Sequence, residues 1–112
     1  MEWELKELLL VNGNSPFADW FKTLDATAAA KVRLGLVRLE QGNGSNVAWF
    51  RGIGEYKIDW GPGLRIYLAR EGLSIILLIG GGTKRRQQHD IERAIALWED
   101  FKRRKASARR GM

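Results

Sequence analysis

The chain has 112 residues, and its 19 lysine and arginine residues against 13 aspartate and glutamate residues give a net charge of +6. This length fits one domain. The lack of cysteine excludes disulfides and cysteine-bound metals, and the single histidine, His89, excludes a multi-histidine metal site, so we expect neither metal nor cofactor.

No stretch of the sequence has the features of a targeting or membrane segment. The first residues, Met1 to Glu4, are acidic and lack a signal-peptide pattern. The longest apolar run, Ile75 to Ile79, falls far short of the roughly 20 residues that span a bilayer. We therefore expect a cytoplasmic protein with no membrane partner.

The positive charge is unevenly distributed along the chain. Residues 1–101 contain thirteen basic and thirteen acidic residues, so all the excess lies in residues 102–112. We interpret 1–101 as one domain and 102–112 as a basic C-terminal tail. Residues 46–89 are also basic, with seven basic residues against three acidic ones. These two regions indicate a polyanionic partner such as nucleic acid, although a charged tail can also serve solubility alone.

The first half of the chain predicts an outer strand followed by two helices. Residues 3–10 fit a short edge strand. Ser15-Pro16 offers an N-cap and a proline at the first helical position, and the helical stripe consists of Phe17, Trp20, Phe21 and Leu24. Asp25 is expected to cap a second helix, which runs through Glu40 and is ended by Gly42-Asn43-Gly44.

The second half predicts antiparallel strands and a last helix. Glu55 to Trp60, Leu64 to Arg70 and Leu73 to Ile79 are strands, joined by turns at Gly61-Pro62-Gly63 and Glu71-Gly72. A glycine run then turns the corner and leads through Lys84-Arg85-Arg86 into an amphipathic helix that begins near Asp90. The apolar face of this helix consists of Ile91, Ala94, Ile95, Trp98 and Phe101.

A hairpin closed at Gly61-Pro62-Gly63 assigns side chains to two sheet faces. One face should pack on the two helices, and it holds Tyr56, Ile58, Trp60, Leu64, Ile66 and Leu68. The other face pairs Asp59 with Arg65, Lys57 with Tyr67, and Glu55 with Ala69. Carried across Glu71-Gly72, this register adds Ser74, Ile76 and Leu78 to the second face. Its apolar part requires cover from the final helix or from a partner chain.

The order of these elements resembles the RelE/ParE toxins of bacterial toxin–antitoxin modules, and more closely the addiction-module killer proteins related to the HigB toxins. The motifs that carry the resemblance lie between Ser15 and Ala94. They are Phe17-x-x-Trp20-x-x-x-Leu24-Asp25, Gly42-Asn43-Gly44, Gly54-Glu55-Tyr56-Lys57-Ile58, Gly61-Pro62-Gly63-x-Arg65-x-Tyr67 and Gly81-x-x-Lys84-x-x-Gln87-x-x-Asp90-Ile91-x-x-Ala94. The resemblance implies an α+β fold with one RelE-like domain. Its antiparallel sheet of about four to five strands would pack against two N-terminal helices, with a C-terminal helix in the order β-α-α-β-β-β-β-α.

Three positions depart from the pattern of that family. Lys57 stands where the family usually has arginine, which keeps the charge and loses the bidentate fork. Thr83 precedes Lys84 where aspartate is usual, and Arg85-Arg86 replace small polar residues. These departures bear on rate and specificity more than on fold.

The resemblance implies a toxin that cleaves messenger RNA on the translating ribosome, inhibits translation, and is blocked by a cognate helix-turn-helix antitoxin. A metal-independent endoribonuclease of this kind uses attack by a 2′-hydroxyl. We expect Arg65 and Lys57 to hold the phosphate, Lys84 to add positive charge, and proton transfer to involve Tyr67, Glu55 or His89. Basic residues expected to bind RNA are Arg51, Arg85, Arg86, Lys102, Arg103 and Arg104.

Two other functions are compatible with the same residues. A ParE-type toxin on this fold would inhibit a protein target such as DNA gyrase without cutting RNA. A non-catalytic nucleic-acid-binding module would use the basic tail. The charges could also form ordinary surface ion pairs, Asp59 with Arg65 and Glu55 with Lys57, which contribute about 0–1 kcal/mol each.

Overall fold

The computed structural model describes residues 2–111 and has the expected α+β fold. The elements follow the predicted order, with a 3₁₀ turn, η1, before the last helix. They are β1 (Glu4–Glu7), α1 (Pro16–Lys22), α2 (Ala26–Glu40), β2 (Val47–Phe50), β3 (Ile53–Ile58), β4 (Leu64–Glu71), β5 (Ile75–Thr83), η1 (Lys84–Arg86) and α3 (Gln87–Arg110). None of the helices in the described residues is long and apolar enough to cross a membrane.

The five strands form one sheet in the order β1-β5-β4-β3-β2. The pairs within β2 to β5 are antiparallel, as expected. β1 runs parallel to β5, so the sheet is mixed and the expectation of a purely antiparallel sheet is corrected. The parallel pair is possible because α1, α2 and the three strands β2 to β4 lie between β1 and β5 in the chain, which makes the connection long enough for a parallel pairing.

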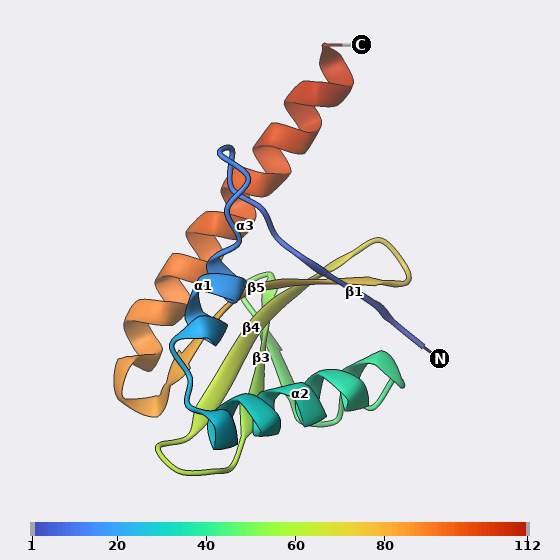
Figure 1. The fold of residues 1–112 in the computed structure, drawn as a ribbon. Coiled ribbons are helices and arrows are strands. Elements are labelled where there is room, and N and C mark those ends of the chain that lie inside the picture. The colour runs from blue at the N-terminus through green and yellow to red at the C-terminus, as the bar shows by residue number, and fades with distance from the viewer. Residues whose placement is uncertain (1, 112) are drawn as a thin grey trace.

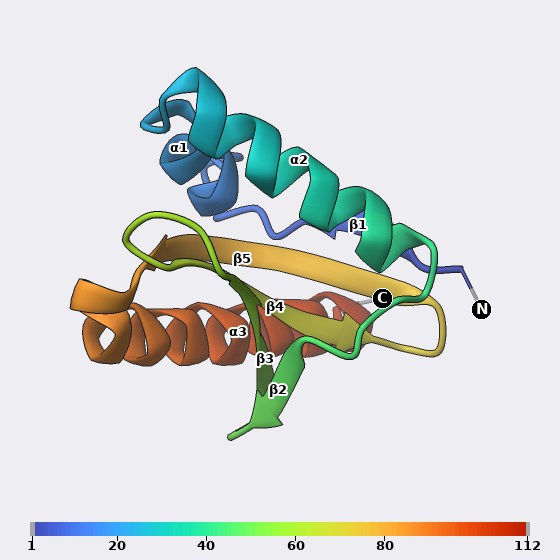
Figure 2. The same cartoon turned by 90° about the horizontal axis from the view of Figure 1, so that it is seen from below.

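Helices cover both faces of the sheet, with α1 and α2 on one side and α3 on the other (Figure 2). Helices α1 and α2 begin where their caps predict. The Ser15 hydroxyl accepts a 3.0 Å hydrogen bond from the Ala18 amide, and an Asp25 carboxylate oxygen accepts one of 2.8 Å from the Ala28 amide. We call the two sheet surfaces the α1/α2 face and the α3 face.

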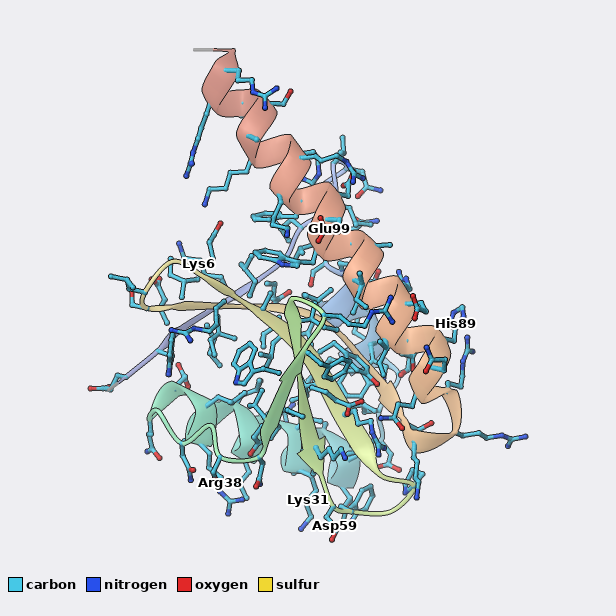
Figure 3. All side chains as sticks on the ribbon, turned by 180° about the vertical axis from the view of Figure 1, so that it is seen from behind. Lys6, Lys31, Arg38, Asp59, His89 and Glu99 are labelled. Atoms are coloured by element: carbon cyan, nitrogen blue, oxygen red, sulfur yellow. The ribbon has the colours of Figure 1, made fainter. Side chains whose placement is uncertain are left out.

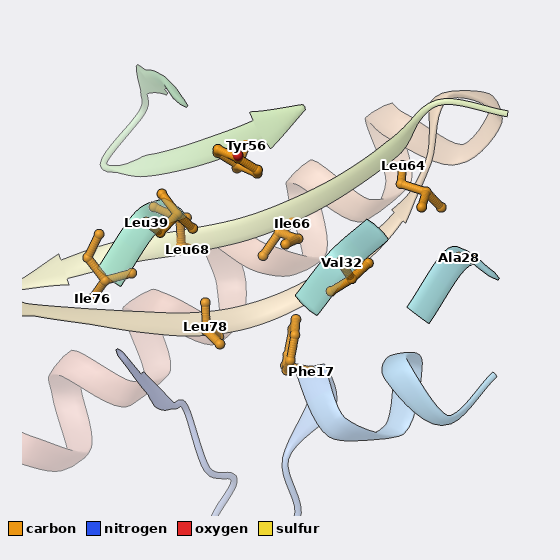
Figure 4. Close-up of a cluster of buried hydrophobic side chains, with 10 residues drawn as sticks. All are labelled: Phe17, Ala28, Val32, Leu39, Tyr56, Leu64, Ile66, Leu68, Ile76 and Leu78. Carbon is orange, nitrogen blue, oxygen red and sulfur yellow. The ribbon is translucent and has the colours of Figure 1, made fainter. Parts of the chain in front are cut away.

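The α1/α2 face carries the larger core. Phe17 of α1 and Val32 and Leu39 of α2 pack on buried side chains of the strands (Figure 4). The strand residues of this core are Tyr56, Leu64, Ile66, Leu68, Ile76 and Leu78. Ile58 and Trp60 pack against its rim, so the six hairpin residues assigned to the helix-packed face do share it.

The α3 face carries a second core. Ile91, Ala94 and Trp98 of α3 pack on Ile53, Tyr67, Ala69, Leu77 and Ile79 of the sheet. The final helix is therefore the cover that the apolar part of this face requires. The predicted apolar stripe of α3 is confirmed, because Ile95 and Phe101 also pack against this core.

The predicted strand registers are wrong in detail. β3 pairs Ile58 with Leu64 and Lys57 with Arg65, a shift of two residues from the register expected. The connection is longer than a three-residue turn, because Trp60 already donates a backbone hydrogen bond to Ile58 within the loop. A shift of two leaves every side chain on its predicted face, because strand side chains alternate with period two.

The predicted faces of β5 are wrong as well. Glu71 pairs with Ile75, so the β4–β5 connection has three residues and places Ile76 and Leu78 in the α1/α2 core. A β-bulge follows, since Tyr67 pairs with Gly80 while its neighbour Leu68 pairs with Leu78. The glycines 80–82 belong to β5, and the corner before α3 consists of η1 alone.

The basic segment that follows residue 101 is helical. Helix α3 continues through Arg110 and projects beyond the sheet (Figure 1). Within this outer part, the Arg104 guanidinium donates a 2.9 Å hydrogen bond to the Leu9 carbonyl, and Lys105 forms an ion pair with Glu71. The basic segment is thus the end of α3 and contacts the domain.

Candidate functional site

The antiparallel pairing of β3 and β4 gathers four of the predicted site residues on the α3 face. Glu55 lies opposite Tyr67, and Lys57 lies opposite Arg65. Directly opposed residues on one face have Cβ atoms about 5 Å apart. The sheet therefore forms a four-residue cluster from two neighbouring cross-strand pairs.

The inner pair of this cluster is buried and centred on the Glu55 carboxylate. The Tyr67 hydroxyl donates a 3.1 Å hydrogen bond to Oε2 of Glu55. The Gln87 side-chain amide donates to both oxygens, at 3.2 Å to Oε1 and 2.9 Å to Oε2. Arg65 Nε lies 3.4 Å from Oε2 and forms an ion pair. With Glu55 2% exposed and Arg65 7% exposed, these contacts hold a charge pair away from water.

The surroundings of Tyr67 decide which way its proton can move. Burial raises the pKa of the Tyr67 phenol well above its ordinary value, and the negative charge of Glu55 raises this pKa further. The hydroxyl therefore keeps its proton at neutral pH. A protonated phenol can donate a hydrogen bond or a proton, and it cannot accept a proton as a general base.

The outer part of the cluster is a basic corner, which we define as Lys57, Arg65 and Lys84. Arg65 Nη1 donates a 3.0 Å hydrogen bond to the Gly63 carbonyl, and the backbone amide of Lys84 donates a 3.0 Å bond to the same oxygen. A side chain at Gly63 would lie 3.1 Å from Arg65 Nη1 and 3.4 Å from Lys84 Cβ, so glycine lets both approach. Lys57 and Lys84 are exposed. This corner can bind an anion at the surface while its arginine is anchored from below.

His89 lies outside this cluster, although it was expected to join it. It lines a groove between α1 and α3 together with Trp20, Arg86 and Asp90; Figure 3 labels it at the first turns of α3. The Asp90 carboxylate lies against the backbone of Gly82, where a Cβ atom would be 2.0 Å from Oδ2. The pKa of Asp90 is raised, because the effect of burial exceeds the opposing effect of the nearby charges of Arg86, His89 and Arg93.

The residues expected to bind RNA are placed in separate regions. Arg85 and Arg86 are exposed in η1 beside Lys84. Arg51 pairs with Glu92 of α3 at 2.6 Å. Lys102, Arg103 and Arg104 lie near the far end of α3 and form ion pairs with Glu99 or Asp100. Only Arg85 and Arg86 therefore extend the basic corner, and the other four are engaged by acidic partners.

Gln87 is the site residue that sequence reasoning missed. It begins α3, and its amide supplies two of the hydrogen bonds that hold Glu55. Gln87 lies three residues after Lys84, at the start of a helix that faces a strand with an acidic residue. This position is the signal from which its place in the site could have been predicted. Among residues 2–111, no group of three or more His, Asp or Glu side chains is placed to hold a metal ion.

Comparison with known proteins gives one informative relative. No family model matches the sequence. The chain is 34% identical over 87 residues to an uncharacterized protein of Haemophilus influenzae, and the match covers 76% of this chain and 88% of that protein.

Proposed function

This chain belongs to one family with the Haemophilus influenzae protein, and we propose that it is the toxin of a toxin–antitoxin module that cleaves messenger RNA. The observation that carries the proposal is the basic corner of Lys57, Arg65 and Lys84, anchored on the buried carboxylate of Glu55. This arrangement supplies positive charge to a phosphate at the surface of the sheet. The resemblance of the sequence to the RelE/ParE toxins supports the proposal that this phosphate belongs to messenger RNA.

The proposed reaction is attack of a ribose 2′-oxygen on the adjacent phosphorus. The bond from phosphorus to the 5′-oxygen breaks, and the products are a 2′,3′-cyclic phosphate and a 5′-hydroxyl end. The 2′-hydroxyl loses its proton to water, and the leaving 5′-oxygen takes a proton from water, so that no net proton is gained or lost. The exposed cations of the basic corner, Lys57 and Lys84, stabilise the extra negative charge of the phosphorane-like transition state, with the buried charge of Arg65 beneath them. No group outside the chain and the RNA is needed for this balance, apart from water.

Glu55 and Tyr67 act in this proposal as positioning residues. Glu55 is buried, and hydrogen bonds from Tyr67 and Gln87 hold its carboxylate in place, so an RNA hydroxyl at the surface has no access to it. The carboxylate instead fixes the direction of the Arg65 side chain. Lys57 and Lys84 are the exposed groups that can reach a bound phosphate.

The burial of Glu55, Arg65 and Tyr67 favours one second candidate, a non-catalytic nucleic-acid-binding module. In that case the basic corner would hold a phosphate without promoting attack. Both candidates place the protein in the cytoplasm with messenger RNA and the ribosome, and the toxin proposal adds a small antitoxin protein as partner.

Expression in bacterial cells separates the two candidates. We expect the wild-type protein to arrest growth and to generate new transcript ends, mapped by sequencing. Lys57→Ala should give far fewer ends, by roughly 100-fold, since loss of one group that stabilises the transition state has about this effect. Lys6→Ala, which removes an exposed charge on β1, is the matched control. Growth arrest with intact transcripts would remove the ribonuclease proposal.

A further inference from the structure

A second basic surface lies between α2 and the end of β3, which we call the α2 groove. Its charged lining consists of Lys31 and Arg38 from α2, Lys57 from β3, and Asp59 from the following loop. Figure 3 labels Lys31, Arg38 and Asp59 and shows them along the lower side of the molecule. Three cations against one carboxylate give the groove a net positive charge.

The α2 groove exists because of two local features. β2 pairs with β3 only up to Tyr56, and the Lys57 amide donates a long 3.5 Å hydrogen bond to the Asn46 carbonyl, so β3 is an uncovered sheet edge from Ile58 onward. Gly35 lets α2 approach this strand closely, because a Cβ atom there would lie 2.9 Å from the Tyr56 ring. The helix and the strand edge therefore form two walls, with Trp60 at the end of the groove nearest the β3–β4 loop.

The cations of the α2 groove have no acidic partner. Among residues 2–111, no ion pair involves Lys31, Arg38 or Lys57, whereas the basic residues 102–105 of α3 all form ion pairs. Trp60 is only partly buried against the core, so part of its ring remains accessible. Unpaired cations beside an accessible aromatic ring are the two elements with which proteins bind single-stranded nucleic acid.

We propose that the α2 groove binds single-stranded RNA and continues the path of the strand held at the basic corner. Lys57 belongs to both surfaces, so a backbone bound at Lys57 in the basic corner can continue to Lys31 and Arg38. A base stacks on Trp60. A duplex fits this arrangement poorly, because its bases are stacked on one another and present no free face to the ring.

The inference rests on the proposed function only for where the RNA is cut. Binding of RNA in the α2 groove can be measured without cleavage. The probe is a fluorescent 2′-O-methyl oligonucleotide of about ten nucleotides, which cannot undergo 2′-hydroxyl attack. The variant Lys31→Glu/Arg38→Glu is compared with Lys6→Glu/Lys22→Glu, which changes the net charge equally at exposed sites outside both surfaces. Binding of the full chain is followed by fluorescence anisotropy over a range of salt concentrations.

We expect the groove variant to weaken binding about 25-fold at about 0.1 M salt and to lower the salt slope by about 1.4, since each phosphate contact contributes about 0.7. The control variant should keep the wild-type slope. Trp60→Ala should weaken binding further than Trp60→Phe, because phenylalanine keeps a stacking surface. Circular dichroism establishes that each variant is folded.

Equal losses in the two charge variants would overturn the inference, as would wild-type binding to duplex DNA that matches binding to the single strand. Binding of an acidic peptide that is lost in the groove variant, with no binding of the oligonucleotide, would overturn the RNA proposal and identify a protein partner instead. A wild-type protein that binds through the groove and leaves unmodified RNA intact would remove the nuclease and keep the groove. If both charge variants bind the oligonucleotide equally well and still cleave unmodified RNA, the nuclease proposal is kept and the RNA-binding role of the α2 groove is removed.

Discussion

The Tyr67 hydroxyl donates its hydrogen bond to Glu55, the residue directly opposite it on β3, at a distance of 3.1 Å. This bond links the two strands beneath the basic corner. It also joins the corner to α3, because Gln87 of that helix donates to the same carboxylate. The geometry of the surface cations is therefore set by a buried polar network, and changes inside that network should affect stability and function together.

Glu55→Gln tests the buried charge pair. The substitution leaves the Arg65 guanidinium buried with no carboxylate, and we expect a loss of about 3 kcal/mol in the free energy of unfolding. Urea unfolding gives the value. Adding Arg65→Met should recover part of the loss, since the unpaired charge is then removed. Glu92→Gln, in an exposed ion pair with Arg51, should change stability little, and an equal loss there would contradict the account.

The pH dependence of stability tests the environment of Tyr67. Because burial and the Glu55 charge raise its pKa above the ordinary 10.0, the folded state holds the phenol proton more tightly than the unfolded state does. The stabilisation from this group is complete below about pH 10 and is lost as pH rises through the raised pKa. Urea unfolding at about pH 9 and about pH 11 should show a smaller decline in Tyr67→Phe than in the wild type. Equal declines would show that the phenol titrates normally.

Gly81→Ala tests the close contact between β5 and α1. A methyl group at Gly81 would lie 2.3 Å from the Trp20 ring, so the helix or the ring has to move. We expect a loss of about 1–3 kcal/mol in urea unfolding. Gly80→Ala is the matched control in the same strand, since a Cβ atom there meets nothing within 4 Å. If both substitutions have the same effect, the cost comes from strand backbone and not from the contact with Trp20.

The sequence was sufficient for the fold and for the faces of the β3–β4 hairpin. Caps at Ser15 and Asp25 and the alternation from Glu55 to Arg70 are local signals, and local signals identify elements and faces. The register error of two residues changed the partners of Lys57 and Glu55 but not the face they share. For this reason the strand residues of the cluster lie on one face as expected but in different pairs, whereas His89 lies outside the cluster and Gln87 was missed.

Features that depend on distant parts of the chain were out of reach. The parallel pairing of β1 with β5 joins the two ends of the fold, and the bulge between Leu78 and Gly80 depends on how β5 fits against β4. The three-residue turn between β4 and β5 moved Ile76 and Leu78 to the other face, and the bulge changes the register only after Leu78. The continuation of α3 beyond Phe101 was not predicted, because a run of basic residues resembles a solvated tail. In the structure, Arg104 and Lys105 of this run contact Leu9 and Glu71, which lie far away in the sequence.

The measurement that tests the central claim most directly is cleavage of single-stranded RNA by the purified protein, with chemical analysis of the new ends. Lys57→Ala is the decisive variant, because Lys57 is exposed and its loss leaves the buried network intact. The account predicts 2′,3′-cyclic phosphate and 5′-hydroxyl ends from the wild type, with a rate roughly 100-fold lower in Lys57→Ala and unchanged in Lys6→Ala. Wild-type protein that leaves RNA uncut both alone and on translating ribosomes, or cleavage that proceeds equally in Lys57→Ala, would contradict it.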